Sequence, residues 1–322
     1  MMDKASTSII IPCKSTDDYV KECVRHCLGL TYANFEVLVL PDYEQPLSFD
    51  DPRVKAIPTG VAKPSEKRNV GMKCSNGEII ALIDADAYPD KDWLRNAVKY
   101  FKDSEVAAVG GPSITPESDG MRQKASGLIL SSRLGGGGLA YRYTIGKMKN
   151  DEDLPTCNLV LRRSVLDKLR GFNIDHWPGE DTYLALQISK HLKMKMVYAP
   201  EVVVYHHRRP LFKRYLKQIW GYGLHRGYFV KKFPQTSRKP IYFVPSLFVV
   251  GFVGGLPLSF LNPILMIVYM SVLTIYFAAC FIEGLKTKNL KMALLVFAGM
   301  FATHVTYGIA FLKGLVTRNL KA

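Results

Sequence analysis

A stretch of 42 consecutive residues without a charged side chain, 241–282, constrains this 322-residue chain more than any other feature. A membrane-spanning helix needs about 20 apolar residues, whereas the core of a water-soluble domain does not need 42 uncharged residues in a row. Glu283 is the only acidic residue from position 241 to the end. The pattern predicts a membrane domain over 241–322 with about three hydrophobic segments, at 241–260, 263–282 and 290–312. The alternative is a buried helical hairpin in a soluble protein.

The segment just before this stretch, 206–240, contains ten Lys or Arg residues and no Asp or Glu, in a chain of net charge +15. Cations beside a membrane segment are attracted to anionic lipid headgroups and mark the cytoplasmic side. We therefore expect a basic, amphipathic interfacial segment on an anionic membrane. No nucleic-acid-binding signature accompanies the block, so nucleic acid is not an expected partner.

Strand-like and helix-like stretches alternate through residues 1–205. This alternation predicts an α/β domain with a mostly parallel sheet. Six cysteines without a C-x-x-C pair, and no visible signal peptide, favour reduced thiols in a cytosolic domain. The four glycines at 135–138 predict a loop, because glycine is the costliest residue to order. Strands are expected at 8–12, 35–40, 54–57, 79–83, 106–109, 158–161, 196–198 and 202–205, and helices at 17–30, 65–74, 92–102, 120–133 and 181–191.

Two carboxylates, Asp84 and Asp86, follow directly after the predicted strand 79–83. The carboxyl end of a strand is where open α/β sheets bind their ligands. Two carboxylates at this spacing can share one hard cation, and Mg²⁺ usually binds one or two carboxylates together with substrate phosphates. The pair therefore predicts Mg²⁺ or Mn²⁺ with a nucleotide diphosphate. Carboxylate pairs without a metal are common at strand ends, so the neighbouring segments decide the interpretation.

Three other segments carry candidate chemistry. Asp42 ends the strand 35–40, where a carboxylate can accept hydrogen bonds from a base or a ribose. Lys67 and Arg68 lie on a helix just before the Asp84 strand and can meet a diphosphate. Asp181, next to Glu180, lies at a predicted helix start, where the helix dipole favours an ionised carboxylate. It is either a helix cap or a general base.

A fourth segment, 213–226, mixes cations, aromatic side chains and glycines. It is predicted to cover a diphosphate at the membrane surface. The alternative is an interfacial amphipathic helix without a catalytic role.

Taken in order, these segments resemble a known family. Ser-Ile-Ile-Ile-Pro at 8–12, Arg68-Asn69-x-Gly71, Asp84-Ala85-Asp86, Gly179-Glu180-Asp181 and Gln218-x-Trp220 look like a family-2 inverting glycosyltransferase of GT-A fold. The ending at 304–315 is similar to that of the membrane-bound subgroup that contains succinoglycan-type exopolysaccharide glycosyltransferases. Since Gln218-Ile-Trp-Gly differs from the Gln-x-x-Arg-Trp of processive synthases, a polymer-extruding enzyme is not expected.

The resemblance implies a role for each candidate residue. Asp181, with Glu180, would be the catalytic base, and Asp84 and Asp86 would hold the metal. Pro12, Asp42, Lys67, Arg68 and Asp84 are the candidates for nucleotide-sugar binding, and Gln218, Trp220 and Arg226 for closure over the diphosphate and the acceptor. Trp177, His304 and Tyr307 are the candidate acceptor contacts.

The predicted function is inverting, metal-dependent transfer of a sugar from a nucleotide-diphosphate sugar, first of all a UDP-sugar, to a polyprenyl-linked acceptor. Such a reaction belongs to glycan or exopolysaccharide assembly by an integral membrane protein. Its catalytic domain would face the cytoplasm, and the resemblance points to a prokaryotic plasma membrane. A polyprenyl-phosphate monoglycosyl synthase and a non-catalytic membrane scaffold are the alternatives. A nucleotidyltransferase also uses paired carboxylates on an α/β sheet, but it would not explain the Glu180-Asp181 element or the hydrophobic segments.

The positions of the C-terminal cations conflict with three full spans. With the first domain inside, three crossings would place Lys313, Arg318 and Lys321 outside, against the positive-inside tendency. The alternative is that one hydrophobic segment is re-entrant or lies in the membrane interface.

Overall fold

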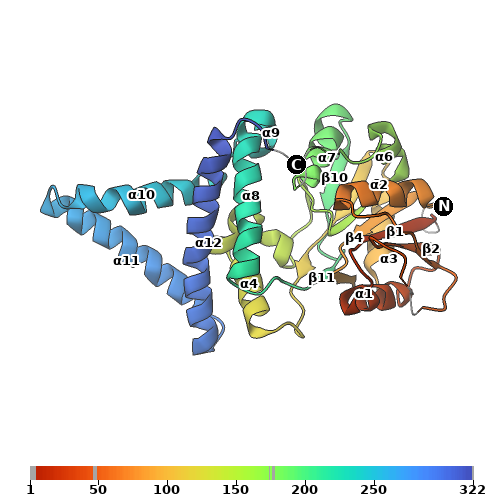
Figure 1. Ribbon diagram of the computed structural model, residues 1–322, viewed down its shortest axis with the longest axis horizontal. Helices are drawn as coiled ribbons and strands as arrows, with labels where there is room; N and C mark the ends of the chain where they lie inside the picture. Colours follow the sequence, from red (N-terminus) through yellow and green to blue (C-terminus); the bar gives the residue numbers. More distant parts are fainter. Residues whose placement is uncertain (1–4, 46–48, 174, 176–177, 321–322) are drawn as a thin grey trace. The chain divides into compact units, whose positions relative to one another are not determined.

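The computed structural model describes residues 5–45, 49–173, 175 and 178–320. The chain divides into two compact units (Figure 1). The first, here called the sheet unit, comprises the chain up to Ile114 together with Thr144–His207. The second, the helical unit, comprises Thr115–Tyr143 and the chain from Arg208 onward. This division into two units does not test the three predicted domains, 1–205, 206–240 and 241–322, which stay predictions.

A mixed eight-stranded sheet forms the centre of the sheet unit. Its order is β3 (Val54–Ala56), β2 (Phe35–Leu40), β1 (Thr7–Pro12), β4 (Ile79–Ile83), β9 (Asn158–Arg162), β6 (Val106–Gly110), β10 (Lys195–Tyr198) and β8 (Lys149–Asn150). The first four strands are parallel, whereas β9 lies antiparallel between β4 and β6. The central strands are buried along their whole length, as expected for a sheet covered on both faces. The predicted α/β class is confirmed.

Four helices of the sheet unit lie at predicted positions, with local changes of type, and a fifth, at Arg163–Leu169, was not predicted. They are α1 (Asp18–Leu28), α2 (Pro64–Cys74), α3 (Trp93–Val98), α6 (Arg163–Leu169) and α7 (Glu180–Leu186). The helix expected at 92–102 ends in a tighter 3₁₀ segment, η2 (Lys99–Lys102), and the helix expected at 181–191 ends in a wider π segment, η4 (Gln187–His191). In α1, the buried residues Val20, Cys23, Val24 and Cys27 follow the spacing of one helical face.

A second, three-stranded sheet lies in the same unit, in the order β5 (Ala87–Pro89), β11 (Val204–His206) and β7 (Ser113–Ile114). The strand expected at 202–205 corresponds to β11, which begins two residues later and ends at His206. In this register His206 pairs with Ala87, the residue that follows Asp86. The small sheet thus brings the end of β11 to the Asp84–Asp86 turn.

Glu36 links several elements at one end of the main sheet. Its carboxylate accepts hydrogen bonds from the Ser8 hydroxyl at 2.8 Å, the Asn76 N–H at 2.7 Å and Lys55 Nζ at 3.2 Å. Burial raises the pKa of Glu36, but these three donors outweigh it and hold the pKa below its usual range.

The helical unit contains α4 (Met121–Ser131), α5 (Arg133–Gly136), η3 (Gly137–Tyr143), α8 (Lys213–Lys232), α9 (Pro234–Ser237), η5 (Pro240–Tyr242), α10 (Val244–Ser259), α11 (Pro263–Leu285) and α12 (Leu290–Val316). The predicted loop at 135–138 is wrong, because these glycines lie in α5 and η3. A Cβ at Gly136 would overlap the carbonyl oxygen of Leu130, so glycine lets this turn fold back onto α4.

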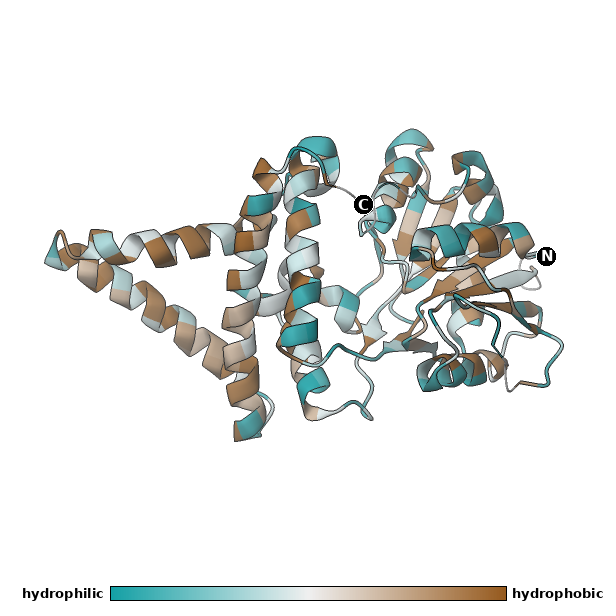
Figure 2. Cartoon of the chain, viewed as in Figure 1, coloured by the Kyte–Doolittle hydropathy of each residue, from teal (hydrophilic) through white to brown (hydrophobic). Residues whose placement is uncertain are grey.

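The three predicted hydrophobic segments correspond to α10, α11 and α12, which are the apolar helices in Figure 2. Of the helices in the described residues, α11 and α12 are long and apolar enough to cross a membrane. α10 is also apolar but has only 16 residues.

Candidate active site

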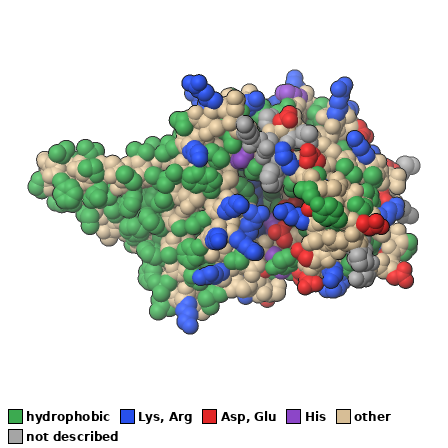
Figure 3. Space-filling model, in the orientation of Figure 1, with side chains coloured by type: hydrophobic (Ala, Val, Ile, Leu, Met, Phe, Trp, Pro, Cys, Tyr) green, Lys and Arg blue, Asp and Glu red, His purple; other side chains and the backbone are tan. Residues whose placement is uncertain are grey.

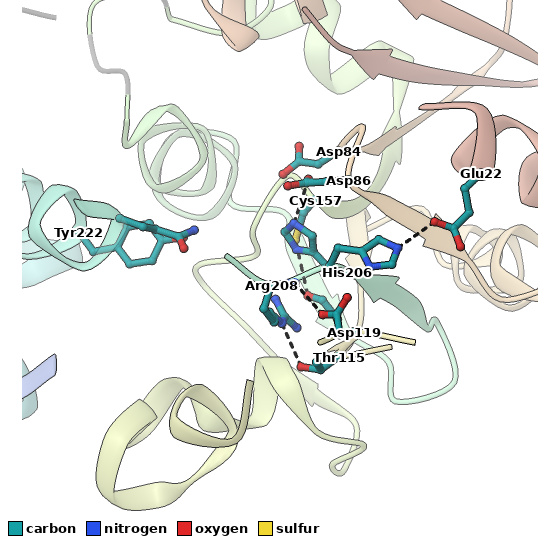
Figure 4. A network of polar contacts seen from close by, with 12 residues as sticks. Glu22, Asp84, Asp86, Thr115, Asp119, Cys157, His206, Arg208 and Tyr222 are labelled. Atoms are coloured by element: carbon teal, nitrogen blue, oxygen red, sulfur yellow. Dashed lines mark hydrogen bonds and ion pairs between the residues drawn. The ribbon is translucent and has the colours of Figure 1, made fainter. Parts of the chain in front are cut away.

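Asp84, Asp86 and His206 form a cluster that fits a divalent cation. Asp84 follows β4, Asp86 lies in the next turn and His206 ends β11, so three segments of the sheet unit meet here (Figure 4). One candidate ligand atom from each lies within 4.8 Å of the other two. Two carboxylates suit Mg²⁺ or Mn²⁺, and an added imidazole nitrogen favours a transition metal. The donor set therefore fits the predicted cofactor.

Hydrogen bonds hold the histidine end of this cluster in place. His206 Nε2 donates to Asp86 Oδ1 at 3.1 Å. The next residue, His207, donates its backbone N–H to the Asp86 carbonyl at 2.9 Å and its Nε2 to Glu22 Oε2 at 2.8 Å. Glu22 on α1 thus holds His207, the residue next to the candidate ligand His206, at the end of β11.

The charge of Asp86 controls the protonation of His206 in this arrangement. Burial lowers the pKa of His206, but the Asp86 carboxylate outweighs it and raises the pKa to about 10. A metal binds the neutral imidazole, so His206 would have to lose its ring proton to serve as a ligand.

Arg68 joins the Asp84 turn to the Glu180 segment. Its guanidinium donates to Asp84 Oδ1 at 3.0 Å and to Glu180 Oε1 at 2.8 Å, and its side chain is only 4% exposed. The Phe172 ring lies 5.8 Å from the guanidinium carbon. The buried Nε of Arg68 makes no hydrogen bond within the described residues. Two segments about 100 residues apart in the sequence are therefore held together by one buried cation.

Asp181 lies at the start of α7, beside this ion pair. Gly179, with φ of 129°, makes a turn that a residue with a Cβ would adopt only with strain. The turn directs Glu180 into the buried pair with Arg68 and leaves Asp181 half-buried. Asp181 Oδ1 accepts the N–H of Thr182 at 2.7 Å. Asp181 therefore lies one residue from the Glu180 carboxylate that Arg68 joins to Asp84.

Lys67 organises the other end of the predicted nucleotide site. Its buried Nζ donates to the carbonyls of Cys13 at 2.7 Å and Leu40 at 3.1 Å, and to the Asp42 carboxylate. All three donors of this ammonium group are engaged by protein, so Lys67 fixes the ends of β1 and β2, where Pro12 and Asp42 lie. Burial raises the pKa of Cys13 to about 11, which keeps this neighbouring thiol protonated.

The remaining candidates lie in the helical unit or outside the described residues. Gln218 Nε2 donates to Tyr222 Oη, and the Trp220 and Arg226 side chains make cation–π contacts with Lys313 and Tyr242. His304 has both ring nitrogens in hydrogen bonds, to Tyr276 Oη and the Leu134 carbonyl, and the Tyr307 ring stacks on Phe311. Trp177 lies outside the described residues. Roles for these residues at the donor or acceptor stay predictions.

Sequence reasoning missed His206 and Glu22. His206 was assigned to the basic interfacial segment because its neighbours are cationic. The signal was available, since it directly follows the predicted strand 202–205, just as Asp84 follows 79–83. The anchoring role of Glu22 depends on a contact 185 residues away in the sequence and gave no local signal.

Comparison with known proteins identifies the family. The model of glycosyl transferase family 2 matches residues 8–170, half of the chain. The chain belongs to this family. As a family 2 glycosyltransferase, it is 24% identical over 322 residues to the dolichyl N-acetyl-alpha-D-glucosaminyl phosphate 3-beta-D-2,3-diacetamido-2,3-dideoxy-beta-D-glucuronosyltransferase of Methanococcus voltae, with 94% of this chain and 95% of the relative covered. It is 30% identical over 105 residues to the UDP-Glc:alpha-D-GlcNAc-diphosphoundecaprenol beta-1,3-glucosyltransferase of Escherichia coli, covering 30% of this chain and 40% of the relative.

Solved structures support the fold. A mannosyltransferase from Pyrobaculum calidifontis, in complex with GDP-Man and Mn²⁺, matches with a TM-score of 0.57 at 18% identity, over 98% of this chain and 88% of that one. A GalNAc-T7 structure with UDP, GalNAc and Mn²⁺ matches with a TM-score of 0.50 at 14% identity, over 74% and 52%. The predicted GT-A glycosyltransferase fold is confirmed, with C-terminal helices that include two candidate membrane spans.

Proposed function

We propose that this glycosyltransferase transfers a sugar, with inversion, from a nucleotide-diphosphate sugar to a lipid-linked acceptor at a membrane surface. The observation that carries the proposal is Arg68, which joins the Asp84 turn to the Glu180–Asp181 segment beside the candidate ligand Asp86. The relatives named above act, by their names, on dolichyl-linked and undecaprenol-linked acceptors, which supports a lipid-linked acceptor here. A UDP-sugar is the donor to test first.

Asp84, Asp86 and His206 would hold Mg²⁺ or Mn²⁺. When bound, such a cation neutralises the charge that develops on the leaving diphosphate. Arg68 holds the Asp84 and Glu180 carboxylates in place through its two hydrogen bonds. Lys67 holds Asp42 at the edge of the sheet, where the nucleotide would bind.

Asp181 is the proposed base. Its carboxylate accepts the proton of the acceptor hydroxyl while that oxygen bonds to the anomeric carbon. The bond from this carbon to the diphosphate oxygen breaks on the opposite face, and the nucleoside diphosphate leaves with the electron pair. One displacement of this kind inverts the anomeric centre, and a positioned base contributes about 10²–10⁴-fold to such a step.

The Asp181→Asn variant tests the assignment. Turnover should fall by about 10²–10⁴-fold, because the amide cannot accept the proton, while donor affinity stays within about twofold. The matched control is Asp167→Asn, which removes an exposed carboxylate on α6 and should behave like wild type. Full turnover by Asp181→Asn, or loss of donor binding with it, would contradict the role of a base.

A further inference from the structure

The helical unit contains a helix pair in backbone contact. α8 and α12 meet at Gly223, Gly227 and Gly314. A Cβ at Gly227 would overlap the Phe311 carbonyl oxygen, and one at Gly314 would overlap that of Leu224. Small residues at such positions let two helices approach closely. No side chain or lipid fits between α8 and α12 at this contact.

Polar contacts extend the pairing along both helices. Near the start of α8, the Thr303 hydroxyl donates to Tyr215 Oη at 3.1 Å. Near its end, Lys231 Nζ donates to the Thr317 carbonyl at 2.7 Å. The contact therefore covers most of α8 and the C-terminal half of α12. Because the two helices run side by side over this length, they must lie at the same depth in a membrane.

α8 has too many cations to cross a bilayer. Its exposed Lys217 and Lys231 are 14 positions apart, which is roughly 21 Å of helix, whereas the hydrocarbon core is about 30 Å thick. Arg226 lies between them, and Lys213, Arg214 and Lys232 add exposed charges at the two ends. Charged side chains avoid the bilayer centre. α8 therefore belongs at the headgroup level, and so does the half of α12 that is locked to it.

Most of the exposed large hydrophobic residues of the helical unit lie on α10 and α11 (Figure 3). In α11, which is apolar on all sides, Ile264 and Ile275 are 68% and 70% exposed. In contrast, nearly half of the apolar stretch of α12 is buried within the helical unit. A helix that leaves its apolar side chains open on every side requires a lipid environment.

Both ends of this α10–α11 hairpin rest on α12. Gly308 is in close contact with Pro245 at the start of α10, and Gly284 at the end of α11 is in close contact with Ala293. Charges resume at both ends, with Arg238 and Lys239 before α10 and Lys286, Lys288 and Lys291 after α11, while the residues between Lys239 and Glu283 are uncharged. Both ends of the hairpin therefore match a surface of anionic headgroups.

We infer that the α10–α11 hairpin is the membrane-inserted part of this chain, and that α12 lies along the same membrane surface as α8 instead of crossing. The occupant of the exposed apolar face is a bilayer with anionic headgroups. The C-terminal cations Lys313 and Arg318 then lie on the same side as the sheet unit, which removes the conflict with the positive-inside tendency. The inference rests on the membrane association in the proposed function, but not on the transfer reaction.

Labelling with a membrane-impermeant maleimide tests this topology. Native Cys74 is the exposed one among the six free cysteines and reports the side of the sheet unit. In a Cys74→Ser background, Lys286→Cys reports the turn after α11 and Arg318→Cys reports the C-terminus. Both positions are exposed, so neither change removes a core contact. Labelling in detergent gives the total reactive thiol for each variant.

All three thiols should react in sealed inverted vesicles and stay protected in sealed vesicles of the opposite orientation. Reaction of Arg318→Cys from the side opposite to Cys74 would show that α12 crosses and would overturn the inference. Release of the protein from membranes by alkaline carbonate would also overturn it, because an inserted hairpin resists that wash. Nucleotide release from donor sugars, measured on the same vesicles, separates this failure from a failure of the proposed function.

Discussion

The buried pairing of Arg68 with Glu180 gives a quantitative test of how the site is held together. The two side chains are 4% and 7% exposed. Removing one partner of a buried ion pair leaves the other charge without compensation and costs about 3–5 kcal/mol. The ion pair of Arg68 with Asp84 adds little to the stability, because the Asp84 side chain is one-third exposed and solvent screens its charge. Arg68→Met should therefore lower the stability of the sheet unit by about 3–5 kcal/mol.

The magnitude is visible in a thermal melt. For a unit of this size, 1 kcal/mol corresponds to about 2–4 °C in Tm, so Arg68→Met should melt about 6–20 °C lower. Glu180→Gln alone should cost about 1–3 kcal/mol, because Arg68 keeps Asp84 as a partner. The double variant should melt no lower than Arg68→Met, because no unpaired buried charge remains, which gives a coupling energy of at least about 1–3 kcal/mol.

The assay is unfolding in detergent at pH 8, followed by tryptophan fluorescence, because Trp93 is fully buried in the sheet unit. The matched control is Arg95→Met, whose ion pair with Asp92 is exposed and worth about 0–1 kcal/mol. If the losses of the two single variants simply add in the double variant, Arg68 and Glu180 do not act as a pair and the reasoning is refuted.

Three further predictions follow from contacts in the two units. Glu22→Gln should weaken Mn²⁺ binding about tenfold, measured by electron paramagnetic resonance of free Mn²⁺, because His207 loses its anchor; unchanged affinity would contradict that role. Glu36→Gln should lower Tm at pH 7, and this loss should vanish toward pH 3. Because the pKa of Glu36 is lower in the folded state, its carboxylate stabilises the fold at pH values above the unfolded-state pKa, and this contribution is lost as pH falls through the folded-state pKa. A loss of Tm that does not depend on pH would contradict this reasoning. Gly227→Ala should lower Tm in detergent, whereas Gly221→Ala on the same helix, with open space at its Cβ, should not; equal effects would argue against the close contact.

Local patterns predicted most of the fold. The buried strands before Asp42 and Asp84 were visible as short apolar runs, and the helix of Arg68 as a stretch between them. The antiparallel β9 was not predictable in its direction, because a buried strand has the same composition in either orientation. The four glycines at 135–138 were misread, since a close approach to α4 and a flexible loop both favour glycine.

Sequence reasoning selected those candidate residues that lie at the ends of predicted strands and helices. Asp84, Asp86 and Asp181 could be found by that rule. Arg68 was found as a cation for a diphosphate, but its bridge to Glu180 depends on two segments 112 residues apart meeting in space. His206 was missed because the cationic residues that follow it in the sequence indicate a membrane-surface segment. In the structure, it ends β11 and lies beside Asp86.

The central claim is tested most directly by nucleotide release from purified protein in detergent, across UDP-, GDP- and dTDP-sugars, with Mn²⁺ or Mg²⁺ and with polyprenyl-linked acceptors. The account predicts release of one nucleotide that depends on the cation and the lipid-linked acceptor and is lost in Asp86→Ala. If polyprenyl phosphate alone supports release, the acceptor is that of a monoglycosyl synthase. Release that persists in Asp86→Ala without added cation would contradict the metal site, and no release from any donor would favour a non-catalytic membrane protein.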